Sequence, residues 1–334
     1  MTHFIADDGE KIHVHVSGEG RPLILLHGWT ANHMEWSPFM RALNEQHRVL
    51  RWDARGHTPD SCDPPRSDPT LQRMACDLRQ LIDHFGLDNI SILGHSMGAL
   101  TLWQYLRDFG TTGLHSLCFI DQSPKLLTDE DWRLGVYGDF DTKRSQAFID
   151  SLHEDFAEGV LKLVAFGRNS RAREGYLANT PAWESTRRRF RAFTPKPLIS
   201  CWRSMTEADY RDVLSKIDVP TLLIYGGQSN FYSTETALFS VSTKARTTHH
   251  TFGNASASSR NCWSSWRSKR SFRILPAMRA PFSFLLSRWL NFAPGLIARA
   301  KTRWYKLNPL RSPWAMAAGP FSSGGPVPCF HAFQ

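Results

Sequence analysis

The residues LGHSMGAL, at positions 93–100, place Ser96 two positions from a glycine on either side. This Gly-x-Ser-x-Gly spacing is typical of a nucleophile elbow, in which a serine sits on a sharp turn between a strand and a helix. Gly94 and Gly98 leave room for the two elements to approach, and the helix dipole favours negative charge developing on the serine oxygen. The alternative is a small-residue turn without chemistry. The flanking sequences, ISIL before and ALTLWQYL after, favour the elbow because they fit a strand and a helix.

The elements around this turn alternate between strand and helix. Apolar residues at helical spacing predict a helix over 77–87 and another directly after Ser96. Short apolar or alternating runs predict strands at 11–16, 22–29, 47–57, 89–94, 114–121 and 219–227. Such alternation is typical of an α/β fold with a mostly parallel sheet and helices on both faces.

Residues 124–215 depart from this alternation. The segment is rich in aromatic and charged residues and its pattern is helical, so it predicts a helical cap inserted between two strands of the sheet. Insertions of this kind lie over the carboxyl ends of the strands, where open α/β sheets hold their sites.

The charge of the chain is divided unevenly. The net charge is +9, yet residues 257–334 carry twelve bases and no acid, while residues 1–256 carry 28 bases and 31 acids. The sequence thus predicts a domain over 1–256 and a basic, irregular and poorly ordered tail. A nucleic-acid or membrane-surface arm is one interpretation of the tail. We favour another, a segment not selected to fold, such as the product of a shifted reading frame or a retained intron.

Targeting and redox signals are few. No apolar run is long enough to span a membrane, and the N-terminus lacks the apolar region of a secretory signal. The six cysteines show no paired spacing, which favours reduced thiols. A cytoplasmic location is therefore the default expectation, with neither a membrane nor a nucleic acid as partner. The sequence does not fix the oligomeric state.

Four motifs in fixed order carry a family resemblance. LLHGW, DARGH, LGHSMGAL and VPTLLIYGG resemble the α/β-hydrolase fold superfamily, in its capped serine esterase and haloperoxidase-like branch, over roughly residues 10–256. The resemblance implies an eight-stranded, mostly parallel sheet with a helical cap. It also implies an oxyanion hole made by two backbone amides, those of Trp29 and Met97. His27 would be structural, and Asp53 and Arg55 would form a local salt bridge in a turn.

The acid of a serine triad has two candidate positions. Many relatives carry it after the strand that here reads TLLIYG, where Ser229 stands instead of a carboxylate. The other position is the end of the preceding strand, LCFID, whose last residue is Asp121. We therefore expect Asp121 to orient the catalytic histidine, although a turn-capping role for this residue is the alternative.

The catalytic histidine is missing from its expected place. A serine needs a base to take its proton, and the family supplies a histidine after the last strand. Residues 247–256 resemble that strand and its exit, yet position 257 is alanine and the acid-free tail begins there. His249, His250 and His331 are weaker candidates. His95 is expected to be a packing residue. His33 and His153 are candidates to line the cap pocket, but the sequence does not place them against Ser96.

The predicted function is a serine hydrolase acting on an ester, lactone or related acyl bond of a small-molecule substrate. A serine elbow argues against haloalkane dehalogenases and epoxide hydrolases, whose elbows carry aspartate, and leaves perhydrolysis open. Cap aromatics suggest an apolar acyl group or ring, and the candidate contacts are Trp132, Tyr137, Phe140, Trp183 and Trp202. Neither a metal cluster nor a phosphate loop is evident, so no cofactor is expected. The alternative is a catalytically impaired hydrolase-like protein that lacks the triad histidine.

Overall fold

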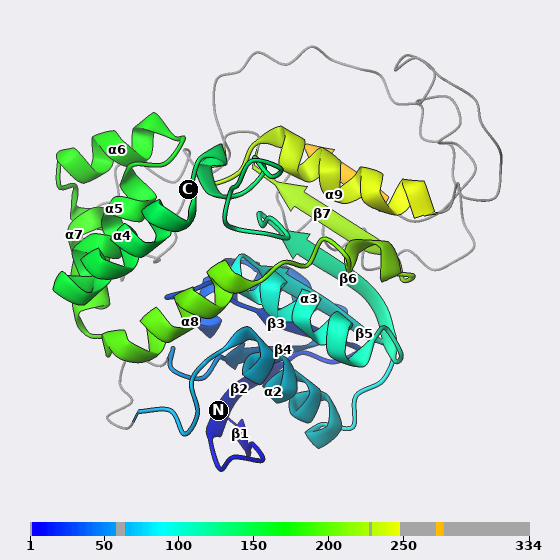
Figure 1. Ribbon diagram of the computed structural model, residues 1–334. Coiled ribbons are helices and arrows are strands. Elements are labelled where there is room, and N and C mark those ends of the chain that lie inside the picture. Colours follow the sequence, from blue (N-terminus) through cyan, green and yellow to red (C-terminus); the bar gives the residue numbers. More distant parts are fainter. Residues whose placement is uncertain (1, 58–63, 227–228, 248–271, 277–334) are drawn as a thin grey trace, which may run out of the picture.

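The computed structural model describes residues 2–57, 64–226, 229–247 and 272–276. They form one eight-stranded sheet with helices packed against it and a helical cap to one side (Figure 1). The strands are β1 (Thr2–Ile5), β2 (Lys11–Ser17), β3 (Arg21–Leu26), β4 (His47–Asp53), β5 (Ile90–His95), β6 (Leu114–Ile120), β7 (Thr221–Tyr225) and β8 (Phe272–Pro276). The helices are η1 (His33–Phe39), α1 (Met40–Leu43), α2 (Leu71–His84), α3 (Met97–Phe109), η2 (Val136–Gly138), α4 (Thr142–Glu154), α5 (Phe156–Ala165), α6 (Ser170–Leu177), α7 (Pro181–Arg191), α8 (Pro195–Glu207), η3 (Leu214–Lys216) and α9 (Thr234–Thr247).

The strand order is β1-β2-β4-β3-β5-β6-β7-β8, and only the β1–β2 and β2–β4 pairs are antiparallel. The expected mostly parallel α/β sheet is therefore confirmed. The order reverses at β3, which lies between β4 and β5, so the loops leaving β3 and β5 meet at the same edge. Crevices at such switch points are the usual ligand sites of open α/β sheets.

The two faces of the sheet are covered by different elements. Buried side chains of α2, α3 and α9 pack on one face with alternate residues of the central strands, such as Ile24 and Leu26. The other residues of the same strands, such as Leu23 and Leu25, pack against η1 and α1. This alternation follows from the two-residue period of a strand, and it produces the near-continuous apolar runs seen in the sequence.

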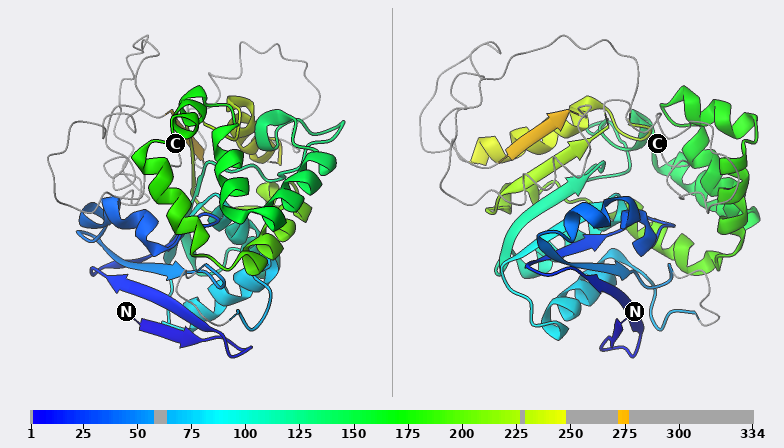
Figure 2. Two further views of the ribbon diagram at one scale, coloured as in Figure 1. Left: turned by 90° about the vertical axis from the view of Figure 1, so that its left-hand side faces the viewer. Right: turned by 180° about the vertical axis from the view of Figure 1, so that it is seen from behind.

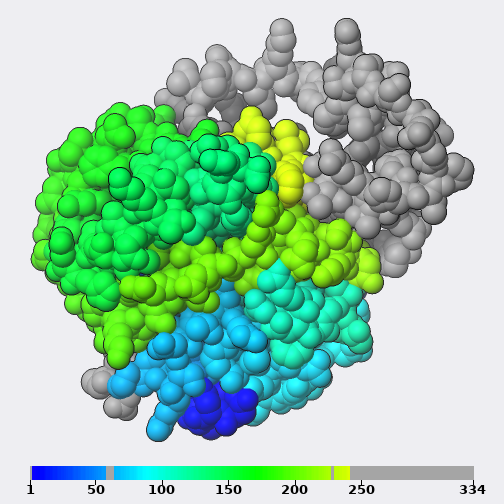
Figure 3. All heavy atoms as spheres, in the orientation of Figure 1, coloured from blue at the N-terminus to red at the C-terminus, as the bar shows by residue number. Residues whose placement is uncertain are grey.

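Helices α4–α8 lie between β6 and β7 in the chain and form the cap. Figure 2 shows α4–α7 as a layer beside the sheet, with α8 leading back toward it, and the cap is a distinct lobe in the space-filling view (Figure 3). Asp141 and Asp155 begin α4 and α5 by accepting hydrogen bonds from the amides of Arg144 and Glu158. Ser204 on α8 accepts a hydrogen bond from the Leu71 amide at the start of α2, which ties the cap to the main domain.

The C-terminal strand differs from the sequence prediction. Thr247 ends α9, so the helix takes the start of the segment expected to be the last strand, and the rest of that segment, 248–256, lies outside the described residues. The strand that extends the sheet beyond β7 is β8, which pairs in parallel with it. Five residues of the tail expected to be irregular are thus part of the sheet. The local sequence did not reveal β8 because an edge strand depends on its neighbour as much as on its own pattern.

Two further expectations concern the whole chain. Across the described ranges, no helix combines the length and the apolar character needed to cross a bilayer. Cys76, Cys118 and Cys201 are free thiols, while Cys62, Cys262 and Cys329 lie outside the described residues.

Candidate active site

The turn between β5 and α3 holds Ser96 in a strained conformation, with φ 49° and ψ −115°. The two glycines are required by backbone contacts. A Cβ atom on Gly94 would lie 2.5 Å from the Gly98 carbonyl oxygen, and one on Gly98 would lie 2.3 Å from the Leu26 carbonyl oxygen on β3. Residues kept at such angles are concentrated at functional sites, because the surrounding structure has to impose them.

The loop that follows β3 lies directly against this turn. A Cβ atom on Gly28 would stand 3.5 Å from the Ser96 Cβ. Trp29, the next residue, is buried, and its indole nitrogen donates to the Leu198 carbonyl oxygen at 3.0 Å. Met97 begins α3, and the amides of a helix's first turn have no acceptor within the helix. The fold therefore brings the segment of Trp29 next to Ser96, which Met97 follows in the chain.

An ion pair that sequence analysis missed joins the loop to the elbow. Glu35 on η1 pairs with His95, the residue before Ser96, and its other oxygen accepts the Gly28 amide at 2.8 Å. Burial alone would raise the pKa of Glu35 and lower that of His95. The attraction between the two groups outweighs it, so the pKa of Glu35 is lowered and that of His95 is raised. His95 thus packs, as expected, with its ring against the carboxylate of Glu35.

His27 and Asp53 hold the neighbouring loops. His27 is fully buried; its Nε2 accepts the Ala54 amide at 3.0 Å and its Nδ1 contacts the Gly28 carbonyl oxygen at 2.8 Å. The expected salt bridge between Asp53 and Arg55 is wrong. Asp53 accepts from the amide and the ring of His33 instead.

Arg55 pairs with two other carboxylates. It makes a bidentate contact with Asp77 at 2.6 and 2.7 Å and a further bond to Asp8 at 2.7 Å. Asp53 and Arg55 have different partners because β4 ends at Asp53 and Arg55 lies in the turn that follows, where the two-residue period of the strand no longer sets the direction of the side chain.

The two candidate positions for the triad acid meet in space. Asp121 directly follows β6, with φ 45°, and Ser229 follows the adjacent strand β7. The Ser229 hydroxyl donates to Asp121 Oδ2 at 2.8 Å and accepts the amides of Phe231 and Tyr232 at 3.2 Å. Burial raises the pKa of Asp121, and the Ser229 bond opposes part of that rise. Asp121 Oδ1 is buried and has no hydrogen-bond partner among the described residues.

A histidine for Asp121 does not appear where the chain leaves the sheet. The residues after β8 are Ala277, Met278 and Arg279. His249, His250 and His331 all lie outside the described residues. His33 lies against Asp53 instead of the cap.

Three of the aromatic residues predicted to contact substrate make other contacts, and of these Tyr137 also packs on Phe140, with ring centroids 6.0 Å apart. Trp132 donates to the Lys125 carbonyl oxygen and packs on Phe239. Tyr137 donates to the Leu163 carbonyl oxygen, and Trp183 packs between α7 and α6 on Tyr176.

The other two predicted rings, Phe140 and Trp202, belong to a set of rings that includes Trp29 in the loop after β3. The Trp29 and Trp202 ring centroids are 4.9 Å apart, and further rings extend the cluster, which we call the aromatic cluster: Trp29, Phe140, Phe148, Phe156 and Trp202. Phe148 and Phe156 were missed by sequence analysis because only the packing of α4 and α5 brings them to Trp29.

Comparison with known proteins agrees with this geometry. The family model described as alpha/beta hydrolase fold matches residues 21–256. The chain belongs to this family. The α/β-hydrolase match begins at β3 and includes the elbow, the cap and α9.

The relatives of this α/β hydrolase have several different activities. It is 26% identical to a non-heme chloroperoxidase of Kitasatospora aureofaciens, over 66% of this chain and 78% of the relative. It is 24% identical to the 3-oxoadipate enol-lactonase 1 of Acinetobacter baylyi, over 65% of this chain and 76% of the relative. The structure of an esterase from Exiguobacterium antarcticum superposes with a TM-score of 0.62 at 24% identity, covering 73% of this chain and 87% of the esterase. The last likeness concerns the fold alone.

Proposed function

We propose that this α/β hydrolase is a serine hydrolase that cleaves an ester, a lactone or a related acyl bond. The observation that carries the proposal is the strained Ser96, held against the Gly28–Trp29 loop and one strand away from Asp121. The Ser96 hydroxyl attacks the acyl carbonyl while a base takes its proton. The Trp29 and Met97 amides donate to the oxyanion, the alcohol leaves with a proton, and water then releases the acid from the serine ester.

The base is proposed to be a histidine that Asp121 orients. Burying a carboxylate oxygen without a hydrogen-bond partner costs roughly 1–3 kcal/mol or more. We therefore expect a hydrogen-bond donor at Oδ1 of Asp121. The candidates are His249 and His250, which follow α9 in the chain. Replacing each by alanine identifies the base, because removing it leaves only the residual rate supplied by the oxyanion amides and binding.

The substrate is proposed to carry an apolar acyl group or ring. The aromatic cluster extends from Trp29, whose amide is the proposed oxyanion donor, into the cap through Trp202. Apolar walls with a few polar groups are typical of small-molecule sites. The enol-lactonase named above is consistent with an acyl bond as the scissile group.

A second candidate function is a hydrolase-like protein without turnover. It is favoured by the absence of histidine from the residues that follow β8, Ala277 to Arg279, and by the acid-free sequence from 257 onward.

The two candidates are separated by labelling the full chain with a fluorophosphonate probe and measuring hydrolysis of p-nitrophenyl acyl esters. The serine hydrolase predicts covalent labelling at Ser96 and turnover, both lost in Ser96→Ala. Ser91→Ala is the matched control. Ser91 is buried on β5, the strand that leads to Ser96, and in the described structure its hydroxyl is hydrogen-bonded only to that of Ser116. A folded chain that neither labels nor turns over establishes the second candidate.

A further inference from the structure

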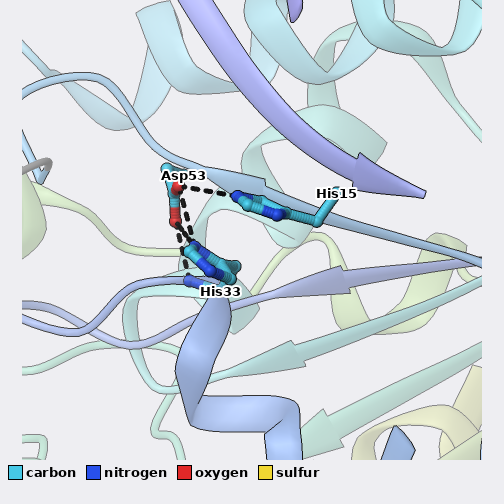
Figure 4. Close-up of side chains that lie close together, drawn as sticks. All are labelled: His15, His33 and Asp53. Carbon is cyan, nitrogen blue, oxygen red and sulfur yellow. Dashed lines mark hydrogen bonds and ion pairs between the residues drawn. The ribbon is translucent and has the colours of Figure 1, made fainter. Parts of the chain in front are cut away.

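Three polar side chains from separate elements converge on the face of the sheet that carries η1 (Figure 4). His15 lies on β2, Asp53 ends β4, and His33 begins η1. β2 pairs with β4, and residues 13 and 15 share one face because successive side chains of a strand alternate. The hydrogen bond from the His33 amide to Asp53, 2.7 Å long, fixes the start of η1 beside the carboxylate.

The ligand atoms of the three residues lie within 4.8 Å of one another. His33 Nδ1 is 2.8 and 2.9 Å from the two oxygens of Asp53, and His15 Nε2 is 3.6 Å from Oδ2. The two imidazole rings are stacked, with centroids 3.5 Å apart. Figure 4 shows both rings turned toward the carboxylate.

Hydrogen bonds account for the position of His33 beside Asp53 but not for that of His15. His15 Nε2 is a buried atom without a hydrogen-bond partner in the described structure, since 3.6 Å to Asp53 is too long for one. A buried polar atom left unpaired is costly, so its retention needs an explanation. A cation bound between the ring and the carboxylate would give His15 Nε2 a partner.

We propose that His15, His33 and Asp53 bind a divalent transition-metal ion of the zinc class. Two imidazole nitrogens and one carboxylate oxygen are a donor set that suits such ions, and zinc sites with three protein ligands keep a fourth position for water. The side chains of His15 and His33 are 17% and 16% exposed, and that of Asp53 is 5% exposed. The ion therefore has access from solvent while the carboxylate is fixed by the protein.

The position of the site lets the ion link three elements of the fold. It joins β2, β4 and η1, and η1 also carries Glu35, which holds Gly28. The ligands are distinct from Ser96, Asp121 and the oxyanion segments, so the inference is independent of the proposed hydrolase activity. Sequence analysis expected no metal because positions 15, 33 and 53 share no short spacing.

One neighbouring group opposes the ion. Arg51, opposite His15 on β4, has its guanidinium 3.4 Å from the His33 carbonyl oxygen. A positive charge on a residue next to the site weakens the binding of a cation. Arg51→Gln is therefore expected to tighten metal binding, whereas loss of either histidine is expected to weaken it.

The test uses the full chain after removal of metal by a chelator. Titration with Zn²⁺ by calorimetry and with Co²⁺ by visible absorption is expected to show one site that is weakened by at least about tenfold in His15→Ala and His33→Ala. Zn²⁺ is also expected to raise the unfolding temperature of the parent chain but not of these variants. His3→Ala is the matched control, because His3 lies on the adjacent strand β1, outside the set.

Equal affinity for Zn²⁺ in the parent chain and in the His15→Ala, His33→Ala double variant would overturn the proposal. His15→Gln serves if the alanine variants fail to fold, which circular dichroism decides. It removes the imidazole ligand and leaves the His33–Asp53 bond in place. An unchanged Co²⁺ spectrum in that variant would also reject the site.

Discussion

Ser96 acquires its properties from its neighbours in the chain and in space. Gly94 and Gly98 permit the close passage of β5, α3 and β3, and the Ser96 amide donates to the Ile120 carbonyl oxygen on β6 at 3.1 Å. The strained turn is therefore fixed from both sides. Its cost, of the order of 1–3 kcal/mol, is carried by the packing of the central strands.

The Asp121–Ser229 contact makes a prediction at the same scale. Asp121→Asn keeps the shape of the side chain but replaces an acceptor oxygen, so a histidine held there would adopt the wrong tautomer. We expect turnover of a p-nitrophenyl ester to fall by about 10⁴-fold. Ser229→Ala removes only one hydrogen bond to the carboxylate, and we expect a much smaller loss. Steady-state kinetics of both variants provide the measurement; equal rates for Asp121→Asn and the parent chain would rule out Asp121 as the acid.

At the scale of elements, η1 positions the loop after β3 through Glu35. Replacing Glu35 by Gln removes the charge that pairs with His95 and weakens the hold on the Gly28 amide. We expect a loss of about 1.5–3 kcal/mol in unfolding free energy and a fall in kcat, since the adjacent Trp29 amide is a proposed oxyanion donor. Urea unfolding and ester hydrolysis are the measurements.

The same pair predicts a pH dependence. Because the pKa of Glu35 is lowered in the folded chain, its ionised carboxylate stabilises the fold above pH 4.5, the ordinary pKa of the group. This contribution is lost as the pH falls through the lowered pKa. Because the pKa of His95 is raised, its protonated ring stabilises the fold below pH 6.5, the ordinary pKa of the group. This contribution is lost as the pH rises through the raised pKa. We expect the stability difference between parent and Glu35→Gln to be largest between these two values. A difference that is flat with pH would contradict the ion pair.

For the whole molecule, Arg55 connects parts distant in sequence. Its guanidinium is fully buried with Asp77 of α2 and also pairs with Asp8, in the turn between β1 and β2. Replacing Arg55 by Met removes the bidentate partner of the buried Asp77 and leaves it only the 3.3 Å contact with Arg73. We expect a loss of about 3–5 kcal/mol in unfolding free energy at neutral pH. Thermal or urea unfolding checks this value.

A surface pair provides the control for Arg55. Arg79 and Asp83 form an ion pair on α2 in which both side chains are about half exposed. We expect Arg79→Ala to change the unfolding free energy by at most about 1 kcal/mol. If Arg55→Met were no more destabilising than Arg79→Ala, the buried network would have no role in joining the N-terminal strands to the sheet.

The sequence by itself determined the fold class, the order of the central elements and the elbow at Ser96. These features depend on neighbouring residues: a strand or helix period, or five consecutive positions whose glycines have a steric function. The position of Asp121 could also be predicted from the sequence, because this residue comes directly after a strand. The α/β-hydrolase family match confirms the expected fold.

Only the tertiary structure decided which distant residues meet. The reversal of strand order at β3 places the Trp29 loop beside the elbow, and adjacent strands bring Ser229 to Asp121. The partners of Arg55, the aromatic cluster over Trp29 and the strand β8 depend on the same long-range packing. No local sequence pattern predicts these contacts. The partner of a side chain depends on which strands pair and which helices pack together, and not on the residues that flank it in the chain. The convergence of His15, His33 and Asp53 is decided in the same way, by three elements that meet only in the folded chain.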